Sequence, residues 1–395
     1  MNLKLNKIME KTISVIGGAG HIGLPLCYLL SKHGFKVIGI DKDKQKIKMI
    51  NNKQVPFIEK GLKNLINKNL NVRFSSKLEE IRNSKYIIVT LGTPIDEYLN
   101  PSYTNFFKVI NEIITHLNDK QVLILRSTLA PGTTRKILDK IRKRNLKAGV
   151  AFCPERISQG NAINEIYDLP QIISYSDNKT KIACKKVFSK FNKELIECSF
   201  EEAEVTKLFC NSWRYIKFAV ANEFFKITKL HNLNFEKIRN TMMYKYERAK
   251  DFPKSGFAAG PCLLKDTMQL SSYSREHFTF GTSAMLVNES LPEFIIDDAK
   301  KKFKIKGKKI LILGMAFKSN NDDARDSLAF RLKKKLTEES PYIYCHDPYI
   351  EPYKNNKVND LIKKCSIIFI GCPHSQYKNL KIPKSKTIID CWGFV

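Results

Sequence analysis

Cys262 is the residue of this chain whose surroundings most suggest covalent chemistry. It lies in the segment Ala-Ala-Gly-Pro-Cys-Leu-Leu-Lys-Asp, where small residues lead to a thiol that is followed by a cation and a carboxylate. A cysteine thiolate can hold an aldehyde as a thiohemiacetal, and loss of a hydride then leaves a thioester that water hydrolyses. One such site could oxidise an alcohol to a carboxylate. The alternative is a buried structural cysteine, because cysteine packs as a small hydrophobe.

Hydride transfer needs a cofactor, and a glycine turn near the N-terminus provides a candidate site for one. Gly18, Gly20 and Gly23 satisfy the pattern G-x-G-x-x-G, with His21 and Ile22 between the last two glycines. The turn follows a β-rich run and precedes a helical pattern. Glycines at these positions permit a tight turn, close approach of a pyrophosphate to backbone N–H groups and close helix packing. The segment predicts a dinucleotide site.

The residue expected to bind the cofactor ribose is Asp41. It ends a second strand-like run at 35–40, at about the 20-residue distance from the glycines that the dinucleotide fingerprint requires. A carboxylate there accepts hydrogen bonds from ribose hydroxyls and repels a 2′-phosphate, which favours NAD over NADP. The cation of Lys42 beside it leaves the preference open, and an ordinary loop carboxylate is the alternative.

Two more strand-like runs, 86–90 and 122–125, alternate with helical patterns as in a parallel, doubly wound sheet. Loops at the carboxyl ends of such strands line the ligand crevice. Taken singly, these loops could be turn chemistry alone. The loop residues of interest are Thr93 and Thr128, and after a final short strand Glu155 and Arg156.

Taken in chain order, these segments resemble the nucleotide-sugar dehydrogenases, the family that includes UDP-glucose, UDP-N-acetylmannosamine and GDP-mannose dehydrogenases. The resemblance runs nearly end to end, and the ordered series is far more specific than any member of it. Its motifs are Pro-x-x-Glu-x-Gly-Leu at 56–62, Gly-Thr-Pro at 92–94, Ser-Thr-x-x-Pro-Gly-Thr-Thr at 127–134, Pro-Glu-Arg at 154–156, Lys-Leu-Phe-Cys-Asn at 207–211, the cysteine segment ending at 266, Leu-Gly-Met-Ala-Phe-Lys at 313–318, Asp-x-Arg-x-Ser at 323–327, Asp-Pro-Tyr at 347–349 and a histidine at 374.

The resemblance implies a four-electron oxidation of the hexose C6 alcohol to a uronic acid, with two NAD molecules as oxidant. Cys262 is then the nucleophile. Lys207 would stabilise negative charge on the C6 oxygen, and Asn211, one helical turn further on the same face, would donate a hydrogen bond there.

The later thioester chemistry is assigned by the same resemblance. Glu155 matches the associated carboxylate, while Asp266 and Thr128 would position the water that Asp266 helps to deprotonate. Lys265 would bind substrate or favour the thiolate electrostatically. Ordinary alternatives are a solvated helix position for Lys207 and Asn211, an ion pair of Glu155 with Arg156, and a helix cap for Asp266.

The match to the family is imperfect around the nucleophile. The usual Gly-Gly-x-Cys-x-Pro-Lys-Asp segment is here Ala-Gly-Pro-Cys-Leu-Leu-Lys-Asp, the glycine turn carries the extra Gly17, and Gln159 stands where some UDP-glucose enzymes have a second glutamate. We therefore expect a less typical branch with a different sugar, rather than UDP-glucose specificity.

Apolar positions recur with helical spacing across residues 201–230, without an internal proline or glycine. The stripe comprises Val205, Leu208, Phe209, Ile216, Val220 and Phe224. One long helix is predicted, and the resemblance implies that it connects domains and forms much of a homodimer interface. Packing within the chain is the competing explanation of the stripe.

Strand-like runs restart after residue 302, which predicts a second α/β domain. The resemblance implies that this domain binds the nucleotide of the substrate, with Lys318 contacting it and Arg325 reaching the cofactor. Cations suit two pyrophosphate ligands, although a surface lysine and an ion-paired arginine are the alternatives. We predict domains at 1–200 (NAD-binding), 201–300 (helical, dimerisation and catalysis) and 301–395 (nucleotide-sugar-binding).

The predicted sites, residue by residue, are as follows. Catalytic residues are Cys262, Lys207, Asn211, Asp266, Glu155 and Thr128. Cofactor contacts are Gly18, Gly20, His21, Ile22, Gly23, Asp41, Thr93, Thr128 and Arg325. Substrate contacts are Glu155, Arg156, Lys207, Asn211, Arg248, Gly260 and Lys318.

The composition of the chain bears on nucleic-acid binding, metal binding and cellular location. The net charge of +29 comes from 68 Lys and Arg against 39 Asp and Glu, but it is diffuse and does not interleave with aromatic residues, which favours a lysine-rich surface over a nucleic-acid groove. Ten scattered cysteines and seven dispersed histidines give no metal signature. The N-terminal segment 1–11 lacks a secretory signal and no segment is apolar enough to span a membrane, so we expect a cytoplasmic protein.

Two other functions remain open at this point. An NAD-linked β-hydroxy-acid dehydrogenase can also use a Lys-x-x-x-Asn arrangement, but it would need neither Cys262 nor a C-terminal nucleotide-binding domain. A non-catalytic nucleotide-sugar binder is the second alternative, and the intact Cys, Lys, Asn and Asp set argues against it.

Overall fold

The computed structural model describes residues 11–191, 194–275 and 277–395. The chain forms two compact units, Met1–Cys210 and Asn211–Val395, and each is described by itself. Residues 1–10, on which most of the expectation about a secretory signal rests, lie outside the described residues. Among the described residues, no helix combines the length and apolar character that crossing a membrane requires.

The first unit is built on an eight-stranded sheet with the order β3-β2-β1-β4-β5-β6-β7-β8. Neighbouring strands run parallel except β6 and β7, which are antiparallel. The strands are β1 (Thr12–Ile16), β2 (Lys36–Ile40), β3 (Val72–Ser75), β4 (Tyr86–Val89), β5 (Val122–Leu125), β6 (Gly149–Phe152), β7 (Gln171–Tyr175) and β8 (Leu195–Glu197).

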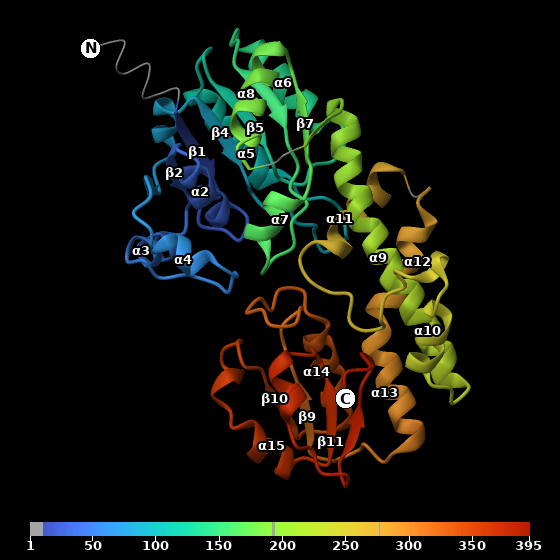
Figure 1. The fold of residues 1–395 in the computed structure, drawn as a ribbon. Coiled ribbons are helices and arrows are strands. Elements are labelled where there is room, and N and C mark those ends of the chain that lie inside the picture. The colour runs from blue at the N-terminus through green and yellow to red at the C-terminus, as the bar shows by residue number, and fades with distance from the viewer. Residues whose placement is uncertain (1–10, 192–193, 276) are drawn as a thin grey trace. The chain divides into compact units, whose positions relative to one another are not determined.

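Helices cover both faces of this sheet, as Figure 1 shows. Apolar side chains of α2 and α8 pack with alternate strand residues in one core cluster, and those of α5 and α6 pack with the other strand face in a second. Because both faces are buried, the central strands β4 and β5 are near-continuous apolar runs, as is usual in parallel sheets. The helices are α2 (Gly23–Lys32), α3 (Lys44–Asn51), α4 (Leu62–Ile66), the 3-10 helix η1 (Leu78–Asn83), α5 (Thr104–His116), α6 (Thr133–Lys143), α7 (Ala162–Asp168) and α8 (Asn178–Phe188).

The predicted doubly wound α/β fold is confirmed, with one correction. Contrary to the prediction, the strand before Glu155 is not the final one, because β7 and β8 extend the sheet beyond β6. Strand β7 lies between α7 and α8, and β8 follows α8. With five and three residues, these strands give little periodic signal in the sequence.

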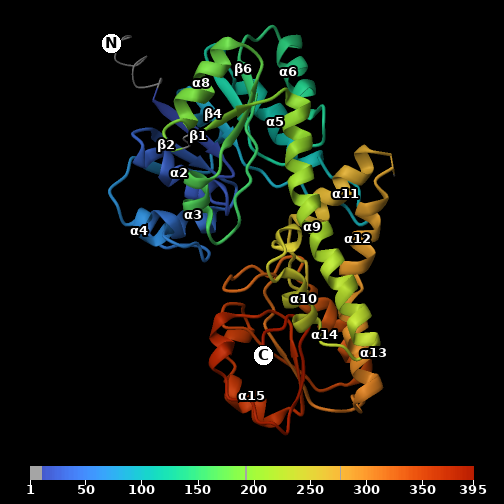
Figure 2. The ribbon, with the colours of Figure 1, turned by 45° about the vertical axis from the view of Figure 1, so that its right-hand side comes forward.

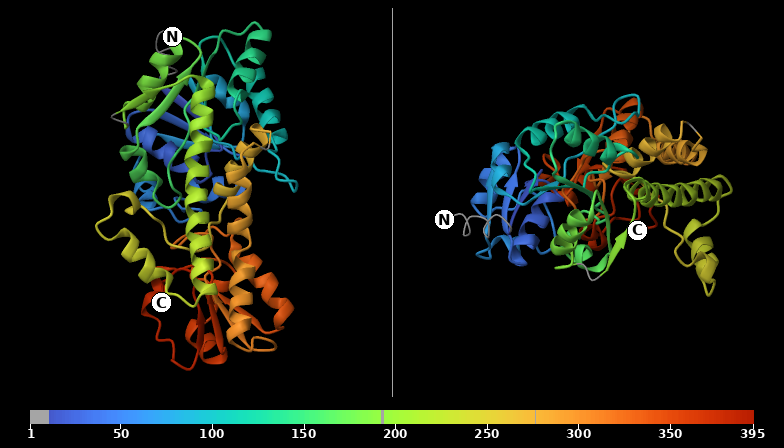
Figure 3. Two further views of the ribbon diagram at one scale, coloured as in Figure 1. Left: turned by 90° about the vertical axis from the view of Figure 1, so that its right-hand side faces the viewer. Right: turned by 90° about the horizontal axis from the view of Figure 1, so that it is seen from above.

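The long helix α9 (Phe200–Leu230) is present as predicted and runs as one continuous element in Figure 3. A capping box starts it: the Glu202 N–H donates to Ser199 Oγ at 3.3 Å, and the Ser199 N–H donates back to Glu202 Oε2 at 2.8 Å. No proline or glycine then interrupts its 31 residues.

The second unit has its own parallel sheet, with the order β10-β9-β11-β12. Helices α13 and α14 pack on one face and α15 on the other, and Figure 2 shows α15 beside this sheet. The elements are β9 (Ile310–Leu313), α14 (Leu328–Glu339), β10 (Ile343–His346), η3 (Tyr353–Asn355), α15 (Val358–Lys364), β11 (Ile367–Ile370), η4 (Ser375–Asn379) and β12 (Thr387–Ile389).

Helices precede this sheet in the second unit. The C-terminal part of α9 packs against α11 and α12 through a small apolar cluster that includes Tyr215, Leu263 and Ala284. The helices are α10 (Phe235–Met243), η2 (Glu247–Ala249), α11 (Leu263–Tyr273), α12 (Thr279–Glu289) and α13 (Leu291–Lys302).

Candidate active site

The glycine turn after β1 is shaped so that side chains cannot enter it. A Cβ on Gly18 would lie 2.6 Å from Gly39 Cα, and one on Gly23 would meet the backbone of Gly17 and Gly18. Gly17 has φ +78°, and its N–H donates to the Ile40 carbonyl at 2.8 Å. Helix α2 begins directly after the turn, and its first turn carries no acidic side chain. A pyrophosphate could therefore approach the helix N-terminus closely.

Asp41 follows β2 at the edge of the same turn. Its Oδ2 accepts the Ala19 N–H and its Oδ1 accepts the Asp43 N–H, both at 3.0 Å. The residue is partly exposed, so each carboxylate oxygen keeps a lone pair for a further donor. Together with the glycine cradle, this carboxylate fits the adenosine ribose and pyrophosphate of NAD.

His21 and Ile22 are the last two residues of the turn before Gly23. The His21 ring is 4.0 Å from the Phe57 ring, and Gln159 Nε2 lies 3.0 Å from His21 Nδ1. Ile22 is the residue that starts helix α2. Gln159 thus contacts the glycine turn.

Thr93 and Thr128 join the loops that follow β4 and β5. The buried Thr93 hydroxyl donates to the Thr128 carbonyl at 2.7 Å. These loops come from neighbouring parallel strands whose carboxyl ends meet at one edge of the sheet. The structure therefore brings these two predicted residues together.

Glu155 is paired differently from the alternative weighed above. Its Oε2 forms an ion pair with the buried Arg126, and its Oε1 accepts the N–H groups of Arg156 at 2.8 Å and Ile157 at 2.9 Å. The Arg156 guanidinium instead donates to the Pro170 carbonyl. The idea of a Glu155–Arg156 ion pair was wrong, because Arg126 is placed directly after β5 and points at the loop after β6.

Lys207 lies on α9, one turn after a buried carboxylate that anchors the helix. Glu204 Oε1 accepts from the Thr134 N–H at 2.7 Å and its hydroxyl at 2.6 Å, while Oε2 accepts the Gly132 N–H at 2.6 Å. Burial raises the pKa of Glu204. These contacts fix the start of α9 to the N-terminus of α6, and Lys207, which is partly buried, follows on the same helix.

In the second unit, Asn211, Lys265 and Asp266 form one cluster. Asn211 Nδ2 donates to Asp266 Oδ2 at 2.5 Å, and the Lys265 ammonium pairs with Asp266 Oδ1. Asp266 is fully buried and Asn211 is 6% exposed. Asn211 is therefore not a solvated helix residue, and the Asp266 side chain does not cap α11 but holds an amide and a cation.

Cys262 precedes α11 and is exposed, whereas the other nine cysteines are buried or partly buried. Its carbonyl accepts the Asp266 N–H at 2.9 Å, which starts the helix. Burial raises the pKa of Cys345 to about 11 and raises that of Cys372 further, so such thiols are unreactive. The alternative of a buried structural cysteine does not apply to Cys262.

The segment before Cys262 needs a glycine. Gly260 has φ +99°, and a Cβ there would overlap the Phe317 ring. Its N–H donates to the Asp326 carbonyl at 3.2 Å. The loops at 256–262 and 314–327 of this unit thus lie against each other, which is why this position excludes a side chain.

The two cations of the C-terminal loop have different surroundings. Arg325 Nε donates to Asp323 at 3.0 Å, and its pKa is raised, first by that hydrogen bond and also by the negative charges of Asp323 and Cys262. Lys318 and Arg248 are both exposed, on the loop after β9 and on η2 respectively.

Arg126 and Glu204 were missed by the sequence analysis. A charged residue directly after a buried strand, as Arg126 is after 122–125, is a usable signal for the first. The sequence signal for Glu204 is weaker: it is a carboxylate three residues before the predicted Lys207 on the same helix. Among the described residues, no three His, Cys, Asp or Glu side chains gather closely enough to hold a metal ion.

Three domain profiles of one family match the chain in order. They are the UDP-glucose/GDP-mannose dehydrogenase family NAD binding domain at residues 11–192, central domain at 201–290 and UDP binding domain at 311–395.

Individual relatives agree with these matches. The chain is 30% identical over 390 residues to the UDP-N-acetyl-D-mannosamine dehydrogenase of Methanocaldococcus jannaschii, covering 96% of this chain and 89% of that one. It is 26% identical over 424 residues to the GDP-mannose 6-dehydrogenase of Pseudomonas syringae pv. tomato, covering 96% of each. The solved UDP-N-acetyl-mannosamine dehydrogenase of Staphylococcus aureus superposes with a TM-score of 0.85 at 26% identity, covering 97% and 95%.

These matches confirm the resemblance inferred from the motifs, and with it an NAD-dependent dehydrogenase. The glycine cradle and the accessible edge of Asp41 fit the cofactor independently of any relative. The chain therefore belongs to the UDP-glucose/GDP-mannose dehydrogenase family.

Proposed function

We propose that this protein oxidises the C6 hydroxyl of a nucleotide-activated hexose to a carboxylate in two NAD-dependent steps through Cys262. The observation that carries the proposal is the placement of Cys262, an exposed thiol at the start of α11, four residues before the buried carboxylate of Asp266. The positive end of the helix and the nearby Arg325 cation both favour the thiolate, the form that attacks carbonyl carbon.

NAD, when bound, accepts a hydride in each of the two steps. In the first, the C6 alcohol loses a hydride and a proton to become an aldehyde, while Lys207 stabilises the negative oxygen and Asn211 donates a hydrogen bond to it. The Cys262 sulfur then bonds to the aldehyde carbon, giving a thiohemiacetal. Loss of a hydride from that carbon and of the proton from its hydroxyl then gives a thioester.

Hydrolysis completes the reaction. Water oxygen bonds to the thioester carbon, the carbon–sulfur bond breaks, and the Cys262 thiolate leaves, so the thiol is regenerated. Asp266 takes a proton from this water, and Thr128 positions the water. Glu155, the other carboxylate assigned to this stage, holds Arg126 and two backbone N–H groups in the loop after β6.

The remaining predicted contacts complete the proposal. We assign the cofactor to Gly18, Gly20, His21, Ile22, Gly23, Asp41, Thr93, Thr128 and Arg325, and the substrate to Arg156, Arg248, Gly260 and Lys318 together with the residues above. The division into 1–200, 201–300 and 301–395 is kept as a proposal for which segments carry these roles.

UDP-N-acetyl-D-mannosamine is the substrate we propose first. Relatives named for that activity are up to 30% identical across nearly the whole chain, and the C-terminal profile is a UDP binding domain. GDP-mannose is the second sugar nucleotide to test, because a relative at 26% identity is named for it.

The test is NADH formation against a panel of UDP-, GDP- and TDP-sugars, with mass spectrometry of the consumed sugar. About two NADH per uronate are expected from the two-step oxidation. Cys262→Ala should form no carboxylate while it still binds NAD and UDP. Uronate production by that variant would refute the covalent route, and turnover of simple hydroxy acids by the wild type would favour a β-hydroxy-acid dehydrogenase.

We also propose a homodimer formed through α9. Its exposed apolar face comprises Phe209, Trp213, Val220, Phe224, Ile227 and Leu230, which are 39–60% exposed. Leu208 of the predicted stripe instead packs within the chain. Contiguous apolar surface of this kind marks partner sites. Trp213→Glu should give a monomer in light scattering after gel filtration. Arg214→Ala, which changes the exposed neighbouring residue, should leave a dimer. A monomeric wild type would contradict the proposal.

A further inference from the structure

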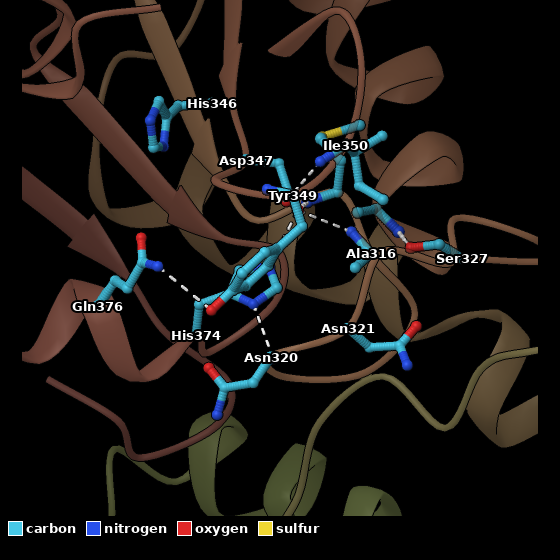
Figure 4. A network of polar contacts seen from close by, with 12 residues as sticks. Ala316, Asn320, Asn321, Ser327, His346, Asp347, Tyr349, Ile350, His374 and Gln376 are labelled. Atoms are coloured by element: carbon cyan, nitrogen blue, oxygen red, sulfur yellow. Dashed lines mark hydrogen bonds and ion pairs between the residues drawn. The ribbon is translucent and has the colours of Figure 1, made fainter. Parts of the chain in front are cut away.

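Two buried titratable side chains of the second unit, Asp347 and His374, have no part in the chemistry proposed above. Asp347 directly follows β10, and His374 lies in the loop after β11. Both side chains are 0% exposed. Figure 4 shows them at the centre of one hydrogen-bonded network. Burying a carboxylate costs free energy unless hydrogen-bond donors surround it. The donors around Asp347 therefore show what this network holds in place.

Asp347 holds the beginning of the loop that follows β9. Its Oδ2 accepts the N–H groups of Met315 at 2.6 Å and Ala316 at 2.9 Å. Its Oδ1 accepts the N–H groups of Tyr349 at 2.8 Å and Ile350 at 3.1 Å. The carboxylate therefore ties the loop after β9 to the loop after β10.

His374 holds the same loop at a second point. Its Nε2 lies 2.9 Å from Asp347 Oδ2, and its Nδ1 lies 2.9 Å from the Asn320 backbone nitrogen (Figure 4). A backbone N–H can only donate, so Nδ1 is the acceptor and the ring proton is on Nε2, from which it is donated to Asp347. His374 is thus a neutral ring that links Asp347 to Asn320.

The ionised state of Asp347 agrees with this arrangement. Burial alone would raise its pKa, but the hydrogen bond from His374 and the backbone N–H donors outweigh burial, and the pKa of Asp347 stays below its ordinary value. The acceptor that orients His374 is therefore present throughout the neutral range.

Lys318 lies between the two anchored points. The loop is fixed at Met315 and Ala316 on one side and at Asn320 on the other, while Lys318 itself is exposed. The neighbouring Phe317 borders Gly260, two residues before Cys262. An exposed lysine on a long loop would otherwise sample many positions, at an entropic cost to any ligand that it binds.

We infer that Asp347 and His374 are positioning residues that hold the loop with Lys318 in the conformation that binds the nucleotide part of the substrate. The inference rests on the proposed function for the role of Lys318. It assigns the pair an effect on substrate affinity rather than on the chemical step or on cofactor affinity. All the proposed cofactor contacts except Arg325 lie in the first unit, and Arg325 is held separately by Asp323.

Two variants of one residue separate the two halves of the link. His374→Gln can keep a donor near the Nε2 position but loses the acceptor at Nδ1, which frees Asn320. His374→Asn can keep the acceptor near Nδ1 but loses the donor to Asp347. His346→Asn is the matched control. His346 is also a buried histidine, its ring contacts Tyr377, and its side chain, unlike its backbone carbonyl, does not hold the loop.

His374→Gln should raise KM for the nucleotide sugar about tenfold, the usual effect of losing one buried hydrogen bond, with kcat little changed. His374→Asn should show a smaller rise, and NAD affinity should be unchanged in all three variants. An unchanged KM in His374→Gln, or an equal rise in His346→Asn, would overturn the inference.

Hydrogen exchange tests the same point without turnover. With UDP as the probe, amides of residues 315–320 should exchange faster in His374→Gln than in His346→Asn, and UDP should bind more weakly. Equal exchange in the two variants would refute the positioning role. If exchange responds but no sugar nucleotide is oxidised by the wild type, the proposed function fails while the loop anchor stands.

Discussion

Asp41 and Asp347 occupy the same topological position in two sheets of similar order, yet they are used in opposite ways. In the first unit β1 lies between β2 and β4, and in the second β9 lies between β10 and β11, with all pairs parallel. Asp41 follows β2 and accepts an N–H group from the turn after β1. Asp347 follows β10 and accepts N–H groups from the turn after β9.

The first turn residue is also shared. Gly17 and Gly314 follow β1 and β9, with φ of +78° and +91°. Each donates its N–H to the last residue of the neighbouring strand at 2.8 Å, to the carbonyls of Ile40 and His346. Gly17, the extra glycine of the sequence, is therefore part of the common scaffold, at a position where glycine adopts the left-handed backbone most readily.

The difference lies in what remains for a ligand. Asp41 is partly exposed and accepts two backbone N–H groups, whereas Asp347 is fully buried and accepts four backbone N–H groups and one imidazole. The carboxylate that can bind a ribose in one unit is wholly structural in the other.

The turns differ accordingly. Residues 17–22 lead at once into α2, so the first unit presents backbone N–H groups and a helix N-terminus to its ligand. Residues 314–327 form a much longer loop before α14, so the second unit presents side chains such as Lys318. Recognition by side chains on a long loop requires anchors, and a buried carboxylate and histidine supply them.

The strongest test of this contrast is to remove each carboxylate. Asp347→Ala leaves five buried donors without an acceptor, so it should lower the free energy of unfolding by about 3–5 kcal/mol. Asp41→Ala should cost less than about 1 kcal/mol in stability, but weaken NAD about 10- to 100-fold through lost ribose hydrogen bonds. Urea unfolding and NADH fluorescence titration measure both. Equal stability losses would show that the two positions do not differ.

The next test concerns the backbone of the first turn. Gly23→Ala puts a Cβ against the backbone of Gly17 and Gly18, which must displace the turn. NAD affinity should fall at least about 100-fold, or roughly 2.7 kcal/mol, while UDP affinity of the second unit serves as the internal control. Normal NAD binding by this variant would contradict recognition through the glycine cradle.

Much of this contrast was accessible to sequence analysis. The first sheet's central strands, the glycine turn and Asp41 followed from local pattern, since each depends on residues close in the chain. The 31-residue helix also followed from its unbroken periodicity. The partners of Glu155 and Asp266 did not, because Arg126 and Asn211 approach them from 29 and 55 residues away. Asp347 and His374 were seen only as motif members, since burial is decided by packing rather than by residue type.

The smallest expected effect is a difference in pH dependence between two buried carboxylates. The folded-state pKa of Asp347 lies below its ordinary 3.8, because the bonds from His374 and the backbone outweigh burial. Its contribution is therefore present above 3.8 and lost as pH falls through the lowered pKa. Burial raises the pKa of Glu204 above its ordinary 4.5, so its contribution is present below 4.5 and lost as pH rises through the raised pKa.

Substitution of each carboxylate by its amide reveals the two opposite slopes. In urea unfolding from pH 3 to 7, the stability difference between wild type and Asp347→Asn should shrink at the acid end of the range. The difference between wild type and Glu204→Gln should instead change above pH 4.5, with the wild type losing relative stability as pH rises. Slopes of the same sign would mean that one of the two carboxylates is not held as described, and a flat difference for Asp347 would remove the evidence that His374 and the backbone keep it ionised.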